Sequence, residues 1–554
     1  MTRKATSTRV ASSMLLLLAI ILAACAPPRA ATEAVPITAP EGAKPPTDKV
    51  ELTVSLPRGG DRLDPQRSTI GTTAYLDNLI YDPLVVKDPE TGELHPWLAE
   101  SFSRSDDGSV WTFRLRDGVK FHDGTPLNAD AVVETMERFV DPDTQNPNAR
   151  FMGSPRVTKI DGMTVEVAYD TYWSPFEDQL LWTGAKLGIL SPAAIEEYGL
   201  EYGQHPVGTG PFMFKEWVEG DHITLVKNPD YSLPKEPFYS VGGAAKIDTL
   251  TFKILPNAQV RFQAQLAGQT QVMLHTIPIK DVEALRADSN QEVHCFTGPL
   301  VQYIGLNVEK EPTSETAVRK ALSLAVDRDL IIDELMYGSA APAYGYIPAS
   351  LEGLGYRSDE LKDVLANDPD AARQMLDDAG WKAGSDGIRA RNGSKLELEL
   401  WCQNTAPHKD IAEALQSMWT NELGMDVKLE TMEPSTFWNT LKEGRMNAWL
   451  GPSMMWEPDF LAYHFDSSRI PGTNRYRYSN PVVDGLLQEG RTTFDRSKRD
   501  GIYAEIQEIV HVDDAVGIPV FYPAICDVYS SNVTNYMVHP SHDEYPLWVD
   551  LMIK

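Results

Sequence analysis

Cysteine is scarce in this sequence, and the few cysteines present form no metal or redox motif. Four cysteines occur among 554 residues, and no two stand in a C-x-x-C spacing. This excludes a zinc knuckle and a dithiol redox motif of that kind. Apart from Cys25, two of the three remaining cysteines could pair outside the cytoplasm. We favour Cys295 with Cys402, and the alternative of buried free thiols, Cys526 included, stays open.

Catalytic signatures are also missing. There is no HExxH motif, no GxSxG elbow and no Walker loop. The segment Gly208–Pro211 lacks the third glycine of a dinucleotide fingerprint, so we predict a turn there. Among eleven histidines, His539 and His542 are close in sequence but have no neighbouring acid or thiol cluster. We expect no enzyme, no cofactor and no metal site. An exported lipoprotein hydrolase is the alternative.

Basic residues are outnumbered, with 50 Lys and Arg against 79 Asp and Glu and a formal charge of −29. Nucleic acid and anionic lipid repel such a chain, so we expect no nucleic-acid partner. The acidity is also the ordinary solvated surface of a large exported protein. The length exceeds what one compact core supports, which predicts two or three domains.

Long apolar runs are absent after the first residues of the chain. Arg3, Lys4 and Arg9 precede a short apolar run, Met14–Leu22, which is followed by Ala-Ala and Cys25. This order predicts an export signal, and the run is too short to span a bilayer. Its end resembles a bacterial lipobox, so we expect a lipid on Cys25 as the only membrane anchor. A plain secretory signal is the alternative, and the Pro-rich segment 26–48 reads as a tether.

Apolar spacing predicts both strands and helices. Val50–Leu56 and Val110–Arg116 alternate apolar and polar positions, as half-buried strands do. Asn128 is a suitable N-cap for a helix with one apolar side over residues 132–139.

A strand–helix–strand unit is predicted between residues 396 and 429. Leu396–Cys402 alternates, residues 411–423 carry a helical apolar stripe that stops before Gly424, and Met425–Leu429 alternates again. This order favours a parallel strand pair and hence α/β domains. In such sheets ligands lie at the carboxyl ends of strands, here near residues 401–405.

Tryptophan and tyrosine are plentiful, at 12 and 21 residues, and five tryptophans fall between residues 401 and 456. Trp419 lies on the predicted helical stripe and is assigned to the core. Trp401, Trp438 and Trp456 lie at predicted strand ends or loops, where either a core or a ligand-cleft position is possible.

Four stretches resemble the large periplasmic and extracellular solute-binding proteins that serve peptide and nickel importers. They are residues 96–132 (beginning PWLAES), 208–231 (beginning GTGPF), 318–328 (VRKALSLAVDR) with PAYGYIP at 342–348, and 396–459 (ending MMWEPD). The resemblance implies an α/β, two-lobed, hinged periplasmic-binding-protein-like fold of the three-domain type. The implied domain I comprises 49–81, 206–297 and 515–554, domain II is an insertion at 82–205, and domain III is 298–514.

The resemblance also implies a function. A solute would be captured between domains I and III and delivered to the permease subunits of an ATP-driven (ABC) importer. We expect an extracytoplasmic monomer that binds a peptide-like or oligosaccharide solute, with nickel or another small solute as alternative. A chaperone-like or adhesive surface protein is a further possibility.

The expected solute contacts come from both sides of the cleft. We expect them from the loop after Leu400 and from the starts or ends of other predicted elements: Thr72, Thr73, Trp401, Gln403, Asn404, Trp438 and Trp456. Peptide-binding relatives carry an Asp shortly before the segment matching Glu457–Asp459, where it holds the peptide's ammonium group. Here Met454 or Met455 takes that place, and a thioether cannot balance a buried cation. We therefore expect free-amine peptides to bind poorly, unless Glu457 or Asp459 substitutes.

Overall fold

The computed structural model describes most of the chain from Lys49 onward. The described residues are 49–68, 71–87, 93–180, 187–233, 243–274, 277, 279–348, 361–455, 457–538 and 548–554. Several predicted features lie outside these ranges: Cys25, the tether 26–48, Trp456, His539, His542 and the side chain of Thr72. Within these ranges, every helix is too short or too polar to cross a bilayer.

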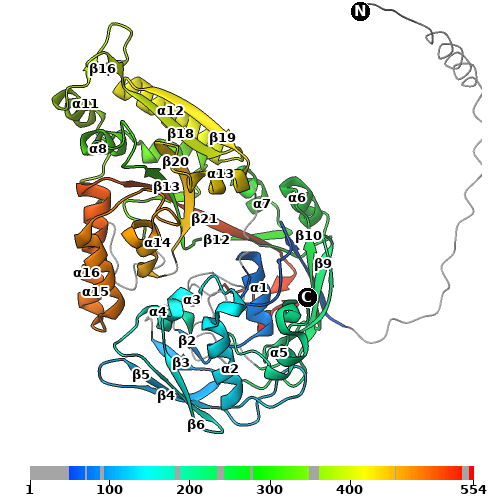
Figure 1. The fold of residues 1–554 in the computed structure, drawn as a ribbon. Coiled ribbons are helices and arrows are strands. Elements are labelled where there is room, and N and C mark those ends of the chain that lie inside the picture. Colours follow the sequence, from blue (N-terminus) through cyan, green and yellow to red (C-terminus); the bar gives the residue numbers. More distant parts are fainter. Residues whose placement is uncertain are drawn as a thin grey trace, which may run out of the picture. The chain divides into compact units, whose positions relative to one another are not determined.

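One twelve-stranded sheet runs through the described residues (Figure 1). Its order is β19-β18-β20-β13-β21-β11-β1-β10-β9-β8, and β12 and β14 also pair with β21. We call β11, β1, β10, β9 and β8 the first half-sheet, and β19, β18, β20 and β13 the second half-sheet. The bounds are β1 Glu51–Leu56, β8 Phe212–Val218, β9 His222–Lys227, β10 Thr249–Ile254, β11 Val272–Met273, β12 Gln291–Thr297, β13 Leu300–Leu306, β14 Ala340–Pro342, β18 Glu397–Gln403, β19 Asp426–Met432, β20 Ala448–Met454 and β21 Gly517–Ser530.

Helices complete the core on these strands. On the second half-sheet, α8, α11 and α12 share one apolar cluster that includes Trp419. On the first half-sheet, α1 contributes Leu76 and Leu79 to a cluster with Val54 of β1. The main helices are α1 Gly71–Ile80, α2 Ala129–Val140, α3 Ala149–Met152, α4 Pro175–Gln179, α5 Pro192–Tyr198, α6 Ala258–Leu266, α7 Val282–Arg286, α8 Thr316–Leu324, α11 Pro369–Asp378, α12 His408–Leu423, α13 Pro434–Leu441, α14 Leu461–Phe465, α15 Pro481–Thr492 and α16 Arg496–Glu508.

The predicted strand–helix–strand unit is confirmed in β18, α12 and β19. The two strands pair in parallel, with Leu400 opposite Leu429. Helix α12 ends at Gly424, whose φ of 62° and ψ of 40° place it in the left-handed region that glycine adopts without strain. The apolar alternation of β18 buries Leu398 and Leu400 because every second side chain faces α12.

A separate four-stranded sheet, β4-β5-β7-β6, carries α2. Its strands are β4 Ala99–Arg104, β5 Val110–Leu115, β6 Arg156–Asp161 and β7 Thr164–Ala168. The predicted cap of α2 is confirmed, since Asn128 Oδ1 accepts from the N–H of Ala131 at 3.0 Å. Trp111 and Phe113 of β5 are buried beneath α2, as the alternation predicted.

Strand β21 belongs to both halves of the large sheet. Its first residues pair with β13, where Gly305 lies opposite Gly517, and its last residues pair with β11 and β12. The chain passes at Gly298–Pro299 from β12, which pairs with the same end of β21 as β11 does, to β13 of the second half-sheet, and it returns along β21. The two half-sheets are therefore joined by two adjacent segments, the arrangement expected of a hinge.

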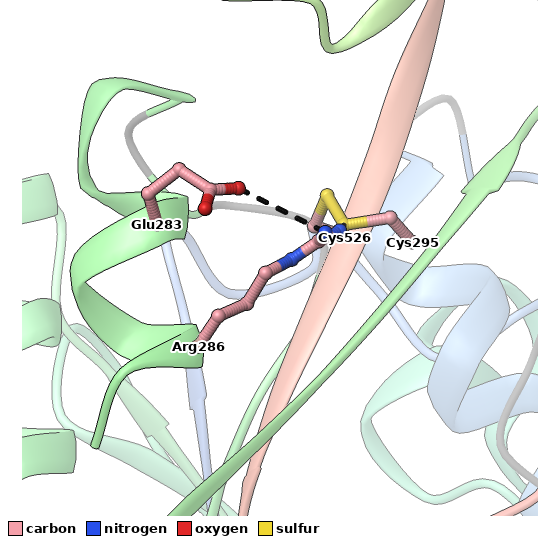
Figure 2. The surroundings of a disulfide bond; sticks show 4 residues. All are labelled: Glu283, Arg286, Cys295 and Cys526. Carbon is pink, nitrogen blue, oxygen red and sulfur yellow. Dashed lines mark hydrogen bonds and ion pairs between the residues drawn. A yellow bond between two sulfur atoms is a disulfide. The ribbon is translucent and has the colours of Figure 1, made fainter.

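The predicted Cys295–Cys402 pairing is wrong, because Cys295 is bonded to Cys526. The antiparallel register of β12 and β21 sets these residues opposite each other, with Cα atoms 4.1 Å apart. Cys402 is a buried free thiol in β18, which is separated from β21 by β20 and β13. Figure 2 shows Arg286 of α7 directed at the disulfide, with its Nη2 3.4 Å from Cys295 Sγ.

Removing this disulfide should destabilise the protein. The variant Cys295→Ser with Cys526→Ser is expected to lose about 2–4 kcal/mol of unfolding free energy in urea titrations, because the unfolded chain gains freedom. As a control, alkylation in denaturant without reductant, followed by peptide mass mapping, should label Cys402 and leave Cys295 and Cys526 unlabelled. If instead Cys526 is labelled and Cys402 is not, the disulfide is Cys295–Cys402, as predicted from the sequence.

Candidate functional site

A cavity of about 380 Å³ lies where the segment after α2 meets the second half-sheet. Its wall combines aromatic rings with polar side chains from several elements. The described lining residues are Asn148, Arg150, Tyr303, Trp438, Pro452, Ser453, Met454, Phe460, Tyr463, His464 and Arg475. No Asp or Glu is among them, although the chain as a whole is acidic.

The end of β20 positions one side of the cavity. Met454 is the last residue of β20 and pairs with Leu300, the first residue of β13. Since β18 and β20 run in parallel, their carboxyl ends share one edge of the sheet. The cavity therefore lies near the sheet edge that the sequence indicated, but residues of β20 line it rather than residues 401–405.

The opposite wall comes from the region of the four-stranded sheet. The rings of Phe151 and Phe460 stack with centroids 5.0 Å apart, and the Arg150 guanidinium lies 5.7 Å from the centre of the Tyr463 ring. A second contact between the same two regions lies outside the cavity, where the centroids of the Phe494 and Tyr172 rings are 5.1 Å apart. The cavity thus lies between two regions of the chain that each have their own sheet. By the boundaries expected from the sequence these regions are domains II and III, whereas the expected cleft lay between domains I and III.

Trp438 and Arg475 place a positive charge against an aromatic ring in the cavity wall. The Arg475 guanidinium lies over the Trp438 ring, 4.8 Å from its centre, a cation–π geometry. Arg475 is only 8% exposed, and its Nε has no hydrogen-bond partner among the described residues. Trp438 is half-buried, so part of its ring remains open to the cavity.

Ser453 and His464 are hydrogen-bonded at the cavity wall. Ser453 Oγ and His464 Nε2 are 2.7 Å apart. Burial, reinforced by the positive charge of Arg475, lowers the pKa of His464 to about 3. The imidazole is therefore neutral near pH 7 and contributes hydrogen bonds rather than charge.

The two predicted acids lie beside the cavity but are already paired. Glu457 Oε2 lies 3.0 Å from Arg499 Nη2, and Asp459 Oδ1 lies 2.7 Å from Arg491 Nε. Both carboxylates are almost fully buried. Each therefore compensates an arginine of the same region, and neither is among the described lining residues.

The remaining predicted residues are distributed between cavity, core and surface. Trp438 and Met454 line the cavity. Met455 is buried in the apolar cluster beneath the cavity, and Trp401, 8% exposed, belongs to the same cluster. The predicted loop after Leu400 starts later than expected, because β18 continues through Trp401 to Gln403, which is buried. Asn404 is exposed, and Thr73 is buried in α1.

Sequence reasoning missed Arg150, Tyr463, His464 and Arg475. No periodic pattern or motif marks these residues. Arg475 looks like its neighbour Arg477 in the sequence, yet only Arg475 faces the cavity. Their common position depends on the long-range packing of α3, α14 and the loop before α15.

Both the sequence and the fold of this chain are similar to those of known proteins. The family described as bacterial extracellular solute-binding proteins, family 5, matches residues 93–471. A nickel-binding periplasmic protein of Escherichia coli K12 is 27% identical, covering 90% of this chain and 93% of the relative. A dipeptide-binding protein of the same strain is 28% identical, covering 86% and 90%. The solved structure of an ABC-transporter-associated periplasmic binding protein from Helicobacter pylori with the peptide STSA is 25% identical, with a TM-score of 0.73 and coverage of 91% and 98%.

Two tryptophans should respond differently to truncation. Trp401→Ala is expected to lower the unfolding free energy by about 3 kcal/mol or more, because it leaves a void in a packed cluster. Trp438→Ala should cost clearly less, since its ring is partly open to the cavity. Urea denaturation of both variants measures the difference. Equal losses would show that Trp438 is a core residue.

Proposed function

Because this chain belongs to family 5 of the bacterial extracellular solute-binding proteins, we propose that it captures a solute for an ABC importer and holds it in the cavity lined by Trp438 and Met454. The observation that carries the proposal is the cavity's position between two regions with their own sheets. A solute that touches both walls binds the closed form more tightly and so favours closure, and the closed surface would be recognised by the permease.

We propose a peptide-like solute first. Relatives named for dipeptide binding and glutathione binding support this choice. The cavity also supports it, because its polar groups, such as the Asn148 amide and the Ser453 hydroxyl, suit the hydrogen-bonding groups of a peptide backbone. An oligosaccharide is the second candidate, supported by the open part of the Trp438 ring. The protein would act without turnover of the solute.

The anchor and domain boundaries complete the proposal. A lipid on Cys25, followed by the tether 26–48, would hold a monomer at the outer face of the cell membrane. The boundaries proposed from the sequence are supported by the sheets. The four-stranded sheet falls within 82–205, β13 to β20 fall within 298–514, and β21 starts two residues after the proposed return to domain I at 515.

Solute binding should close the cavity. Mass spectrometry of small molecules released from the purified protein identifies the solute, and adding it back should reduce the radius of gyration in X-ray scattering. Trp438→Ala is expected to weaken binding by roughly tenfold or more, since a partly buried aromatic contact commonly contributes that much. Neither a released solute nor a solute-dependent change in radius would contradict the proposed function.

Blocking the amine of a peptide should not weaken its binding. A free ammonium would lose its water with no acid among the described lining residues to replace it, so the N-acetylated form is expected to bind about tenfold tighter in calorimetry. If instead the free amine binds tighter, and Glu457→Gln or Asp459→Asn removes that margin, one of these acids leaves its arginine to hold the ammonium.

A further inference from the structure

Arg475 is a buried cation without an acid to compensate it. In the described ranges its guanidinium forms no ion pair, its Nε has no hydrogen-bond partner, and its side chain lines the cavity. The Trp438 ring beneath it attracts the charge but does not neutralise it. Removing a guanidinium from water without an opposite charge is costly, so this position calls for an anion.

Other buried arginines are compensated either by backbone carbonyls or by acids. Arg319 and Arg328 form no ion pair among the described residues and donate to carbonyl oxygens instead. Arg491 pairs with Asp459, Arg499 with Glu457, and Arg469 with Asp466 at 3.7 Å. These six side chains belong to the same stretch of sequence as Arg475, residues 457–499. Arg475 differs from the three paired arginines in facing the cavity, where a solute rather than a side chain can provide the charge.

A second cation lines the same cavity from the other wall. Arg150, in α3, donates to the carbonyl oxygen of Pro147 at 2.9 Å and has no ion pair among the described residues. The hydroxyl of Ser453 and the amide of Asn148 add neutral donors. The chain as a whole has a formal charge of −29, but the described lining of this cavity contains two arginines and no acid. The cavity wall is therefore positively charged in an otherwise acidic protein.

We propose that this cavity contains an anion subsite in which Arg475, with Arg150 facing it, holds a negatively charged group of the solute. For a peptide-like solute this group is a carboxylate, which a guanidinium can bind through two parallel hydrogen bonds. The inference rests on the proposed function and names the charge that its solute must carry. An anion touching both arginines also bridges the two walls, so it contributes to closure as well as to affinity.

The first test uses matched probes. N-acetylated di- and tripeptides are compared as free acids and as carboxamides, by calorimetry, on wild type, Arg475→Gln and Arg477→Gln. Arg477 is the control because it lies in the same loop, donates to the Lys442 carbonyl oxygen and is not among the lining residues. In wild type and Arg477→Gln the acids should bind at least about tenfold tighter than the amides, and in Arg475→Gln this preference should disappear.

The second test needs no peptide. Since Arg475→Gln removes an uncompensated buried charge, the solute-free variant should melt at a higher temperature than wild type, whereas Arg477→Gln should not. Inorganic phosphate and acetate should raise the melting temperature of wild type and Arg477→Gln more than that of Arg475→Gln.

The outcomes separate the two proposals. If amides bind as well as acids, or the solute released from the purified protein is uncharged, the anion subsite is wrong while the importer function stands. An Arg475→Gln variant that melts lower, with its acid preference intact, would also overturn the subsite by showing a structural role. If no probe binds and no solute is released, the proposed function itself fails.

Discussion

Both half-sheets depend on β21, because one strand supplies hydrogen bonds to each of them. Its first residues complete the second half-sheet beside β13, and its last residues hold β11 and β12 on the other side. The backbone groups of a buried strand must be paired, so neither half-sheet can move away without breaking this ladder. Relative motion is therefore confined to a bend within β21 and at Gly298–Pro299.

Buried pairs of acids and arginines hold the segments around the cavity together. Glu457 and Asp459 follow β20 closely, yet their pairing with Arg499 and Arg491 ties the segment after β20 to α15 and α16. These buried pairs position the 3-10 turn Pro458–Phe460 and α14, which carry Phe460, Tyr463 and His464 to the wall. The acids thus compensate arginines beside the cavity, and the arginines in its described lining are Arg475 and Arg150.

Local sequence patterns predicted much of this fold, and long-range contacts account for what they could not predict. The alternation of Leu398 and Leu400, the position of Gly424 and the cap at Asn128 each follow from one element alone, and the structure confirms them. The Cys295–Cys526 bond depends on the register of two strands 231 residues apart in sequence, which no local pattern encodes. The same holds for Arg475. Met454 could be predicted because it ends β20 at the sheet edge, whereas Trp438 lines the cavity from within helix α13 and not from the strand end or loop that the sequence suggested.

The Cys295–Cys526 bond has a mechanical consequence. It makes residues 296–525, which include most of the cavity wall, a side loop of the covalent chain. Tension between Lys49 and Lys554 would pass from β12 through the sulfur atoms into β21 and would bypass that loop. Pulling on the two ends of the segment 49–554 would therefore not stretch the backbone of residues 296–525. A single peptide-bond cut within the loop would likewise leave one molecule, whose two pieces separate only after reduction.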